Sequence, residues 1–349
     1  MGQLPRRELL RLMGLAGGGI AIGSVAAACG SGGGSGGRDI VLGVYGGPQE
    51  PVYRTHVADR LEAEDDANVT LALGTGGERV SKVYAERNQP SLDVAMLAIW
   101  DAVKGVEDGV LEEPDPSVPN VDQIHDFAVN GGYVASAFNL GLRYNPAKID
   151  RPTSFEDLWN PEYAGHVAVP DPGKNANGIA FIAMLAQMYA NDDLDNVDPV
   201  WDRLTALRDG LVLQYSSEND TNSLWDAQDI WIAVSSSSFA WQFKFEGSAD
   251  VDFVTPTEGG ALMGNVACIP VGANNPELAR KAVGYMLDEP FQKEFAETHY
   301  FVPSREGVTV DAETQELLPD PSELVVLDYS TLARVRPDWS DRWTREMAG

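Results

Sequence analysis

Apolar segments that end in glycine-rich turns and are followed by helical segments recur along the body of the chain. Residues 40–45, 69–73 and 92–97 are the first three apolar segments, and each has the length of a buried strand. Helices are expected between them, over 48–64 and from Gly77 onward, because apolar residues recur there at helical spacing. This β-α-β-α-β pattern predicts a parallel sheet that is covered by helices on both faces.

The pattern returns in the second half of the chain. The long apolar stretch 133–144 is expected to cross between two domains, and further strands are expected at 166–170, 230–234 and 251–254. A helix over 179–189 follows the first of these three strands. Since the chain has 349 residues, it has room for two domains of the α/β class, each with a sizeable core.

In open α/β sheets, ligands bind beyond the carboxyl ends of the strands. The turns at those ends are therefore expected to meet in one binding region, where glycines expose backbone N–H groups and helix N-termini add partial positive charge. The ligand-binding residues predicted from these turns are Tyr45, Gly46, Gly47, Thr75, Gly76, Gly77, Trp100, Asp101, Asp171, Asn175, Asn177, Ser235 and Ser236. For any one glycine, a tight turn with no contact to a ligand is an equally good interpretation.

Residues 1–28 are predicted to be an export signal and not part of the fold. Arg6 and Arg7 precede a weakly apolar segment that is too short to span a membrane, as in a twin-arginine signal. The segment ends in small residues before Cys29, which resembles a lipobox and predicts lipidation of Cys29. An ordinary signal peptide with an A-x-A cleavage site is the alternative. The Gly/Ser-rich tether 29–37 favours the lipid anchor, because a flexible tether suits a folded body held at a membrane.

The chain is strongly acidic, with 53 acidic and 25 basic side chains and a formal net charge of −28. Nucleic acid is excluded as a partner, because its phosphates would be repelled. The acidity, with only 7 lysines among the basic residues, fits either a high-salt habitat or ordinary solubility. The two cysteines are too few for a disulfide framework or a four-cysteine zinc site, and Cys268 is predicted to be a buried strand thiol.

The sequence carries no enzyme signature. A hydrolase would need a nucleophile with a base, or a metal cluster, but the four histidines are scattered and no H-E-x-x-H or G-x-S-x-G motif surrounds them. The turn 74–79 lacks the third glycine of a dinucleotide-binding fingerprint. We therefore expect no catalytic residue, no cofactor and no metal. A secreted hydrolase and a ligand-sensing or adhesive surface lipoprotein stay open as alternatives of other classes.

Several short motifs occur in a fixed order along the chain. They are Tyr45-Gly46-Gly47, Leu92-Asp93-Val94 followed by Trp100, the segment TSFEDLWNPEYAGHV at 153–167, Pro256–Gly260 before Ile269-Pro270, Pro303-Ser304-Arg305, and the tail 336–343. In this order they resemble the extracellular solute-binding proteins of ABC importers, of the spermidine/putrescine-binding type. The resemblance extends over nearly all of Asp39 to Met347.

The resemblance implies a two-lobed, type II periplasmic-binding-protein-like α/β fold, with the ligand held in a cleft between lobes that close about a hinge. It places residues 38–140 and 266–300 in lobe 1, and residues 141–265 and 301–349 in lobe 2. It also implies that ABC permease and ATPase subunits are partners, and that the protein lies on the outer face of the cytoplasmic membrane. A monomer is expected, because the clamp must open freely against its transporter.

The solute implied by the resemblance is a polyamine, which the family boxes with aromatic rings and fixes with carboxylates. Trp100 stands at the position of a binding-site tyrosine of the family, and Met263 and Asn265 stand where the family has a Trp-x-Asp pair. Lys174 stands where the family places acidic residues. These departures keep an anionic or zwitterionic solute (an amino acid or a phosphonate) open as an alternative, because the Asn and Ser side chains at the predicted helix starts are neutral donors. Thiamine is a further alternative.

Overall fold

The computed structural model of the protein describes residues 38–247 and 250–347. The predicted export signal over 1–28, the tether over 29–37 and the lipidation of Cys29 lie outside the described residues. Over the described part of the chain, we find no helix that combines the length and the apolar character needed to cross a bilayer.

The first half of the fold is built on three parallel strands in the order β2-β1-β3. These strands are β1 (Asp39–Val44), β2 (Asn68–Leu73) and β3 (Val94–Ala98). The helices of this half are α1 (Glu50–Tyr53), α2 (Asp59–Asp65), α3 (Gly76–Ala85) and α4 (Ile99–Glu107). The first two are joined by a π-helical turn, Arg54–Ala58, so that the helix predicted over 48–64 is nearly continuous.

The second half of the fold repeats this plan. Its parallel strands lie in the order β6-β5-β7, and a short strand, β8, pairs with β4. These strands are β5 (Val167–Pro170), β6 (Leu211–Tyr215), β7 (Ile232–Ser236) and β8 (Asp252–Val254). The helices are α5 (Ala176–Tyr189), α6 (Asp198–Arg208), α7 (Asn222–Asp226) and α8 (Ser237–Glu246).

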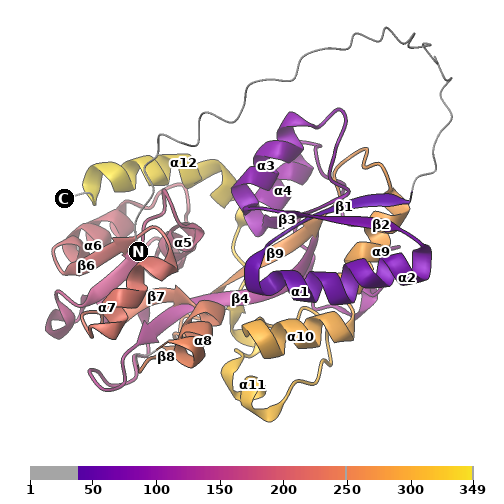
Figure 1. Cartoon of the computed structure of the whole chain (residues 1–349). Helices are drawn as coiled ribbons and strands as arrows, with labels where there is room; N and C mark the ends of the chain where they lie inside the picture. Colours follow the sequence, from indigo (N-terminus) through magenta and orange to yellow (C-terminus); the bar gives the residue numbers. More distant parts are fainter. Residues whose placement is uncertain (1–37, 248–249, 348–349) are drawn as a thin grey trace, which may run out of the picture. The chain divides into compact units, whose positions relative to one another are not determined.

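Two long antiparallel strands, β4 (Tyr133–Tyr144) and β9 (Gly260–Cys268), join the two halves. β9 pairs with β3 and β4 pairs with β7, both antiparallel, which gives the continuous order β2-β1-β3-β9-β4-β7-β5-β6. Figure 1 shows β4 and β9 side by side between the two sets of helices. The parallel strands of each half therefore lie next to one of the two long strands, β9 in the first half and β4 in the second. In this arrangement the carboxyl ends of the parallel strands of both halves are expected to face the same region.

The C-terminal part of the chain contributes helices to both halves. Its elements are α9 (Pro276–Met286), α10 (Glu289–His299), α11 (Ala312–Leu317), β10 (Leu324–Val325) and α12 (Tyr329–Glu346). The last helix, α12, packs against α4 of the first half and against α5 of the second half, as can be followed in Figure 1. It contains Pro337 in its interior. The lobe boundaries given above stay a prediction, in which α12 belongs to lobe 2.

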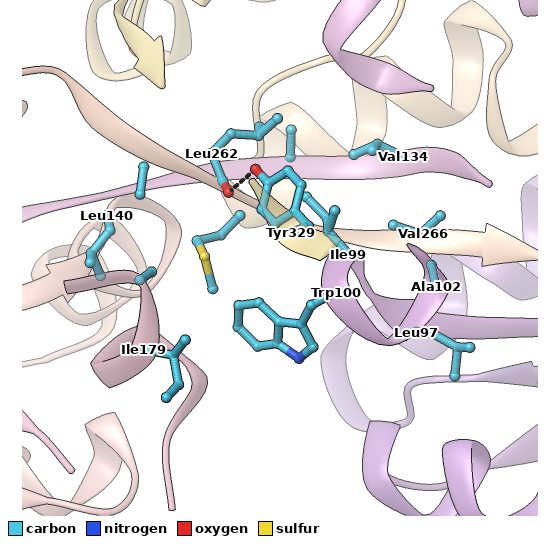
Figure 2. Packing of buried hydrophobic residues seen from close by; sticks show 14 of the residues in the cluster. Leu97, Ile99, Trp100, Ala102, Val134, Leu140, Ile179, Leu262, Val266 and Tyr329 are labelled. Carbon is cyan, nitrogen blue, oxygen red and sulfur yellow. Dashed lines mark hydrogen bonds between the residues drawn. The ribbon is translucent and has the colours of Figure 1, made fainter. Parts of the chain in front are cut away.

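The largest of three apolar clusters in the described part of the chain runs through both halves and the strands between them. Figure 2 shows part of it, where Trp100 and Ile99 of α4 lie close to Leu262 of β9 and to Tyr329 of α12. The Tyr329 hydroxyl donates a hydrogen bond of 2.7 Å to the Leu262 carbonyl oxygen. Cys268 is a buried free thiol at the end of β9, as predicted, and burial raises its pKa well above the usual range.

Two local features differ from what the sequence pattern indicates. β6 was not predicted, and Thr153 and Glu156, which have the spacing of a capping box, do not form one. Ser154 is the N-cap residue, and its partner is Asp157, whose carboxylate accepts from the Ser154 N–H at 3.1 Å. Asp157 also accepts from the Thr153 N–H at 2.7 Å, so that one carboxylate satisfies two backbone donors ahead of the turn.

Two glycines in first helical turns should respond in opposite ways to replacement by alanine. A Cβ atom on Gly178 would lie 2.5 Å from the backbone nitrogen of Pro172, whereas a Cβ atom on Gly77 would meet nothing within 4 Å. Gly178→Ala should lower the free energy of unfolding by about 1–3 kcal/mol, because the backbone must shift. Gly77→Ala, the matched control, should leave it equal or raise it by up to about 1 kcal/mol. Urea denaturation measures both, and equal effects would contradict this packing.

Candidate functional site

A cavity of about 500 Å³ lies where segments from both halves and from α12 meet. Its lining residues are Gly76, Gly77, Ala98, Trp100 and Asp101 from the first half, Pro172, Gly173, Lys174, Asn175, Ala176 and Ile179 from the second half, and Arg336, Pro337 and Ser340 from α12. The segments from the two halves directly follow β2, β3 and β5, which is the position expected for a ligand site in an α/β sheet. Of the residues predicted from the sequence, Gly76, Gly77, Trp100, Asp101 and Asn175 line the cavity.

The first wall of the cavity is formed by the start of α4. Trp100 and Asp101 follow directly after β3, and only 3% of Trp100 is exposed. Asp101 accepts a hydrogen bond from the guanidinium of Arg336, with 3.4 Å between Nη1 and Oδ1. Burial raises the pKa of the Asp101 carboxyl, and the nearby Arg336 charge opposes this shift. The Arg336 guanidinium also lies 5.8 Å from the centroid of the Trp100 ring.

The start of α3 completes this wall with backbone and not with side chains. Thr75 is the N-cap residue, and its hydroxyl is occupied by Glu78, which accepts from the Thr75 hydroxyl at 3.0 Å and from the Thr75 N–H at 2.8 Å. Thr75 therefore does not line the cavity, although the two glycines that follow it do. A Cβ atom on Gly76 would lie 3.2 Å from the Tyr45 hydroxyl, so glycine allows a close approach here.

Tyr45, Gly46 and Gly47 lie behind this wall and do not line the cavity. The Tyr45 ring lies against the buried guanidinium of Arg79, with 4.1 Å from Cζ to the ring centroid. Arg79 in turn donates hydrogen bonds to backbone carbonyl oxygens, including that of Met96 at 2.6 Å. Tyr45 is thus a support for the turns around it. Gly47 has a φ of +67°, the left-handed conformation that glycine adopts without cost.

The turn after β5 forms the second wall. Lys174 lines the cavity, and its ammonium lies 3.0 Å from Oδ2 of Asp171. The other Asp171 oxygen accepts from the Gly173 N–H at 2.9 Å, so Asp171 holds the turn together and does not itself line the cavity. Asn175 is the N-cap of α5 and accepts from the Asn177 N–H at 2.9 Å.

Asn177, Ser235 and Ser236 were predicted to offer neutral donors to a ligand, but their donors are taken by Glu218. This carboxylate follows β6 and is 8% exposed. It accepts from Nδ2 of Asn177 at 2.8 Å, from the N–H and hydroxyl of Ser236 at 3.0 and 2.8 Å, and from the Ser235 hydroxyl. The sequence prediction missed Glu218 because it missed β6, which brings this residue between the starts of α5 and α8.

A buried arginine compensates the charge of Glu218. Arg143, on β4, is 1% exposed and lies against the ring of Trp225, 4.5 Å from its centroid. It donates to the hydroxyl of Thr221, which donates to the Glu218 carbonyl oxygen at 2.6 Å. Burial lowers the pKa of Arg143 to about 10, and the Glu218 charge opposes this shift.

Met263 and Asn265 lie on β9 and do not line the cavity. Met263 is buried opposite Phe138 of β4. Asn265 donates to the Ser136 hydroxyl at 3.0 Å, again across the β4–β9 pair. Both residues are therefore part of the strand pairing between the two halves.

Arg336 and Ser340 line the cavity and were not predicted as site residues. They stand one turn apart on α12, and the Ser340 hydroxyl lies 3.3 Å from the Pro172 carbonyl oxygen. The only local signal in the sequence is the Arg336-Pro337 pair in an otherwise helical tail. Two other cavities of about 640 and 390 Å³, the first lined in part by Pro48 and Phe239 and the second by Trp241 and Lys244, contain none of the predicted residues.

The sequence matches the family model described as bacterial extracellular solute-binding protein over residues 104–333. It is 25% identical over 187 residues to the spermidine/putrescine-binding periplasmic protein of Escherichia coli (strain K12), covering 53% of this chain and 52% of that protein. It is 24% identical over 217 residues to the thiamine-binding periplasmic protein of Salmonella typhimurium, covering 62% of each. The chain thus spans about half the length of the first of these curated relatives.

Two solved structures share the fold over most of their length. One is described as an ABC transporter from Clostridium perfringens, with a TM-score of 0.77, 26% identity, and coverage of 88% of this chain and 99% of that chain. The other is described as a putative extracellular solute-binding protein from Bordetella parapertussis, with a TM-score of 0.79, 22% identity, and coverage of 89% and 99%. These likenesses confirm the two-lobed, type II α/β fold predicted from the sequence.

Replacement of Glu218 by glutamine should destabilise the protein. The amide can accept with only one atom, so if its oxygen keeps the contacts to Asn177 and Ser236, its NH₂ group takes the place of the oxygen that accepts from the Ser235 hydroxyl. The negative charge that faces the buried Arg143 is also lost. We expect the free energy of unfolding to fall by about 3 kcal/mol, as for other broken buried charge networks. Urea denaturation measures the change, with the exposed Glu162 and its Glu162→Gln variant as the matched control. Equal stability of the two variants would contradict the network.

Proposed function

The chain belongs to the family of bacterial extracellular solute-binding proteins, and from this premise we propose that it captures a small polar organic solute in the cavity next to Trp100 and delivers it to an ABC transporter. The cavity itself is the observation that carries this proposal, because its lining comes from both halves of the fold and from α12. A solute held there would touch all three parts at once. Such contacts can bias an equilibrium between open and closed arrangements, which a permease can sense.

Both the relatives and the lining of the cavity bear on the chemical class of the solute. The curated relatives are named for spermidine and putrescine or for thiamine, which are cationic. Trp100 and Asp101 support a cationic group in the cavity of this protein, through the face of an indole ring and a carboxylate. Lys174 and Arg336 support an anionic group in the same cavity.

We propose binding without chemical turnover, since the family is one of binding proteins. The four histidines support this proposal, because each is engaged at a different place. His56 lies 2.6 Å from Glu294, His125 stacks on Phe127, His166 stacks on Trp231, and His299 is buried next to Phe295. Within the ranges 38–247 and 250–347, we find no group of three or more His, Cys, Asp or Glu side chains that could hold a metal ion.

Movement of the two halves is proposed to occur about β4 and β9, with the lobes bounded as predicted from the resemblance. Arg336 and Ser340 support a role for α12 in this movement, since they contact Asp101 in the first half and Pro172 in the second. A monomer that is lipid-anchored through Cys29 on the outer face of the cytoplasmic membrane, with permease and ATPase subunits as partners, is our proposal for the assembly.

Trp100 should report the solute. In a melting-temperature screen of polyamines, amino acids, phosphonates and thiamine, the solute is the compound that stabilises the protein without being converted. Trp100→Ala should weaken its affinity at least tenfold, and Trp100→Phe should remove most of the solute-induced fluorescence change. Trp231→Ala is the control, because Trp231 stacks on His166 outside the cavity. Product formation would favour the hydrolase alternative, and unchanged affinity in Trp100→Ala would remove Trp100 from the site.

Replacement of Cys29 should release the protein from the membrane. If Cys29 carries the lipid, Cys29→Ser should appear in the soluble fraction after export, because the body without its lipid lacks the proposed anchor. Cell fractionation followed by immunoblotting measures this, with Cys268→Ser as the control, since Cys268 is buried. A Cys29→Ser variant that stays with the membrane would refute the lipid anchor.

A further inference from the structure

We infer that the cavity takes a solute with an anionic head group, of the carboxylate or phosphate type, received between Arg336 and Lys174. This inference rests on the proposed function and specifies the charge of the solute. A di- or polyamine fits this place poorly, because its positive charge would be repelled by the two cationic side chains. The inference therefore distinguishes this protein from receptors that need only bind a cation.

Arg336 has donors to offer. A guanidinium carries five N–H donors, and among the described residues Asp101 is the only side chain shown to accept from Arg336, through one contact of 3.4 Å. The Arg336 side chain is 43% exposed and lines the cavity. Planar, bidentate recognition of a carboxylate or phosphate is the interaction that a guanidinium makes best.

Lys174 lines the same cavity from the turn that follows β5. Its turn is held next to α12, because a Cβ atom on Gly173 would lie 3.8 Å from Cβ of Ser340 and the Ser340 hydroxyl lies 3.3 Å from the Pro172 carbonyl oxygen. Arg336 and Ser340 are four residues apart on one helix, so they share a face. The Lys174 side chain is 65% exposed and can turn toward a group bound at Arg336.

The carboxylates in and near the cavity already have partners within the protein. Asp101 is the only carboxylate that lines the described cavity, and it faces Arg336. Asp171 is bound to Lys174 and to the backbone of its own turn. Glu218 is buried and surrounded by four donors. A diamine would therefore meet two cations and one paired carboxylate, whereas an anionic head group would meet two cations and the positive ends of α3 and α5.

The choice of charge can be tested with solutes of matched length. The full protein is titrated calorimetrically with 5-aminovalerate, glutarate and cadaverine. Its melting temperature is also screened against two sets of compounds. The first set contains amino acids, dicarboxylates, phosphonates and sugar phosphates, and the second contains di- and polyamines and thiamine. Stabilisation by carboxylates or by phosphate-type compounds supports the inference, and comparison of the carboxylates with the phosphonates and sugar phosphates within the first set separates these head groups. Stabilisation only by amines or thiamine overturns the inference but keeps the proposed function. Stabilisation by neither set counts against both.

The role of Arg336 is tested with the best anionic compound from that screen. Arg336→Gln should raise its Kd at least tenfold, and Lys174→Gln should raise it by a smaller factor. Arg334→Gln is the matched control, because Arg334 stands two residues away on α12 and pairs with Asp195 at an exposed site. Melting temperatures without solute verify that the variants are folded. An unchanged Kd in Arg336→Gln, or an equal loss in Arg334→Gln, overturns the inference.

Discussion

The antiparallel pairing of β4 with β9 is the interaction on which the arrangement of the site depends. β4 is buried along nearly its whole length, and β9 is buried except at Asn265. Each strand also pairs with a strand of one parallel set, β9 with β3 and β4 with β7, so the pair holds both sets in one sheet. The movement proposed above would have to bend these two strands without separating them, because each buried backbone group that loses its partner costs about 1–3 kcal/mol.

The strands of the sheet can be predicted from the sequence where both of their faces are buried. β4 has its predicted bounds, 133–144, since apolar residues dominate its twelve positions and almost all of its residues are buried. β6 has the sequence LVLQY, and only Tyr215 in it is fully buried. Its half-buried positions and Gln214 interrupt the apolar pattern, so neither alternation nor a continuous run marks it as a strand.

The site can be predicted only as far as it follows predicted strands. Trp100 and Asp101 are found in this way, because they come directly after β3. Glu218 cannot be found without β6. Arg336 reaches Asp101 from 235 residues away along the chain, on a helix whose docking depends on tertiary packing, and no local pattern encodes such a contact. The turn rule thus leads to five residues that line the cavity, but it also selects Asn177 and Ser236, whose donors bind an internal carboxylate.

Pairing of charges within the protein determines what the cavity offers to a solute. Glu218 occupies the place that an external anion would take between the starts of α5 and α8. The positive charge of the buried Arg143 compensates the charge of this carboxylate. The pairs Arg336–Asp101 and Lys174–Asp171 are partly exposed, and pairs of this kind contribute at most about 1 kcal/mol each. A solute can therefore replace one partner of a pair at little cost. Since both cations line the cavity but Asp171 does not, the exchange favours a solute that brings the negative charge itself.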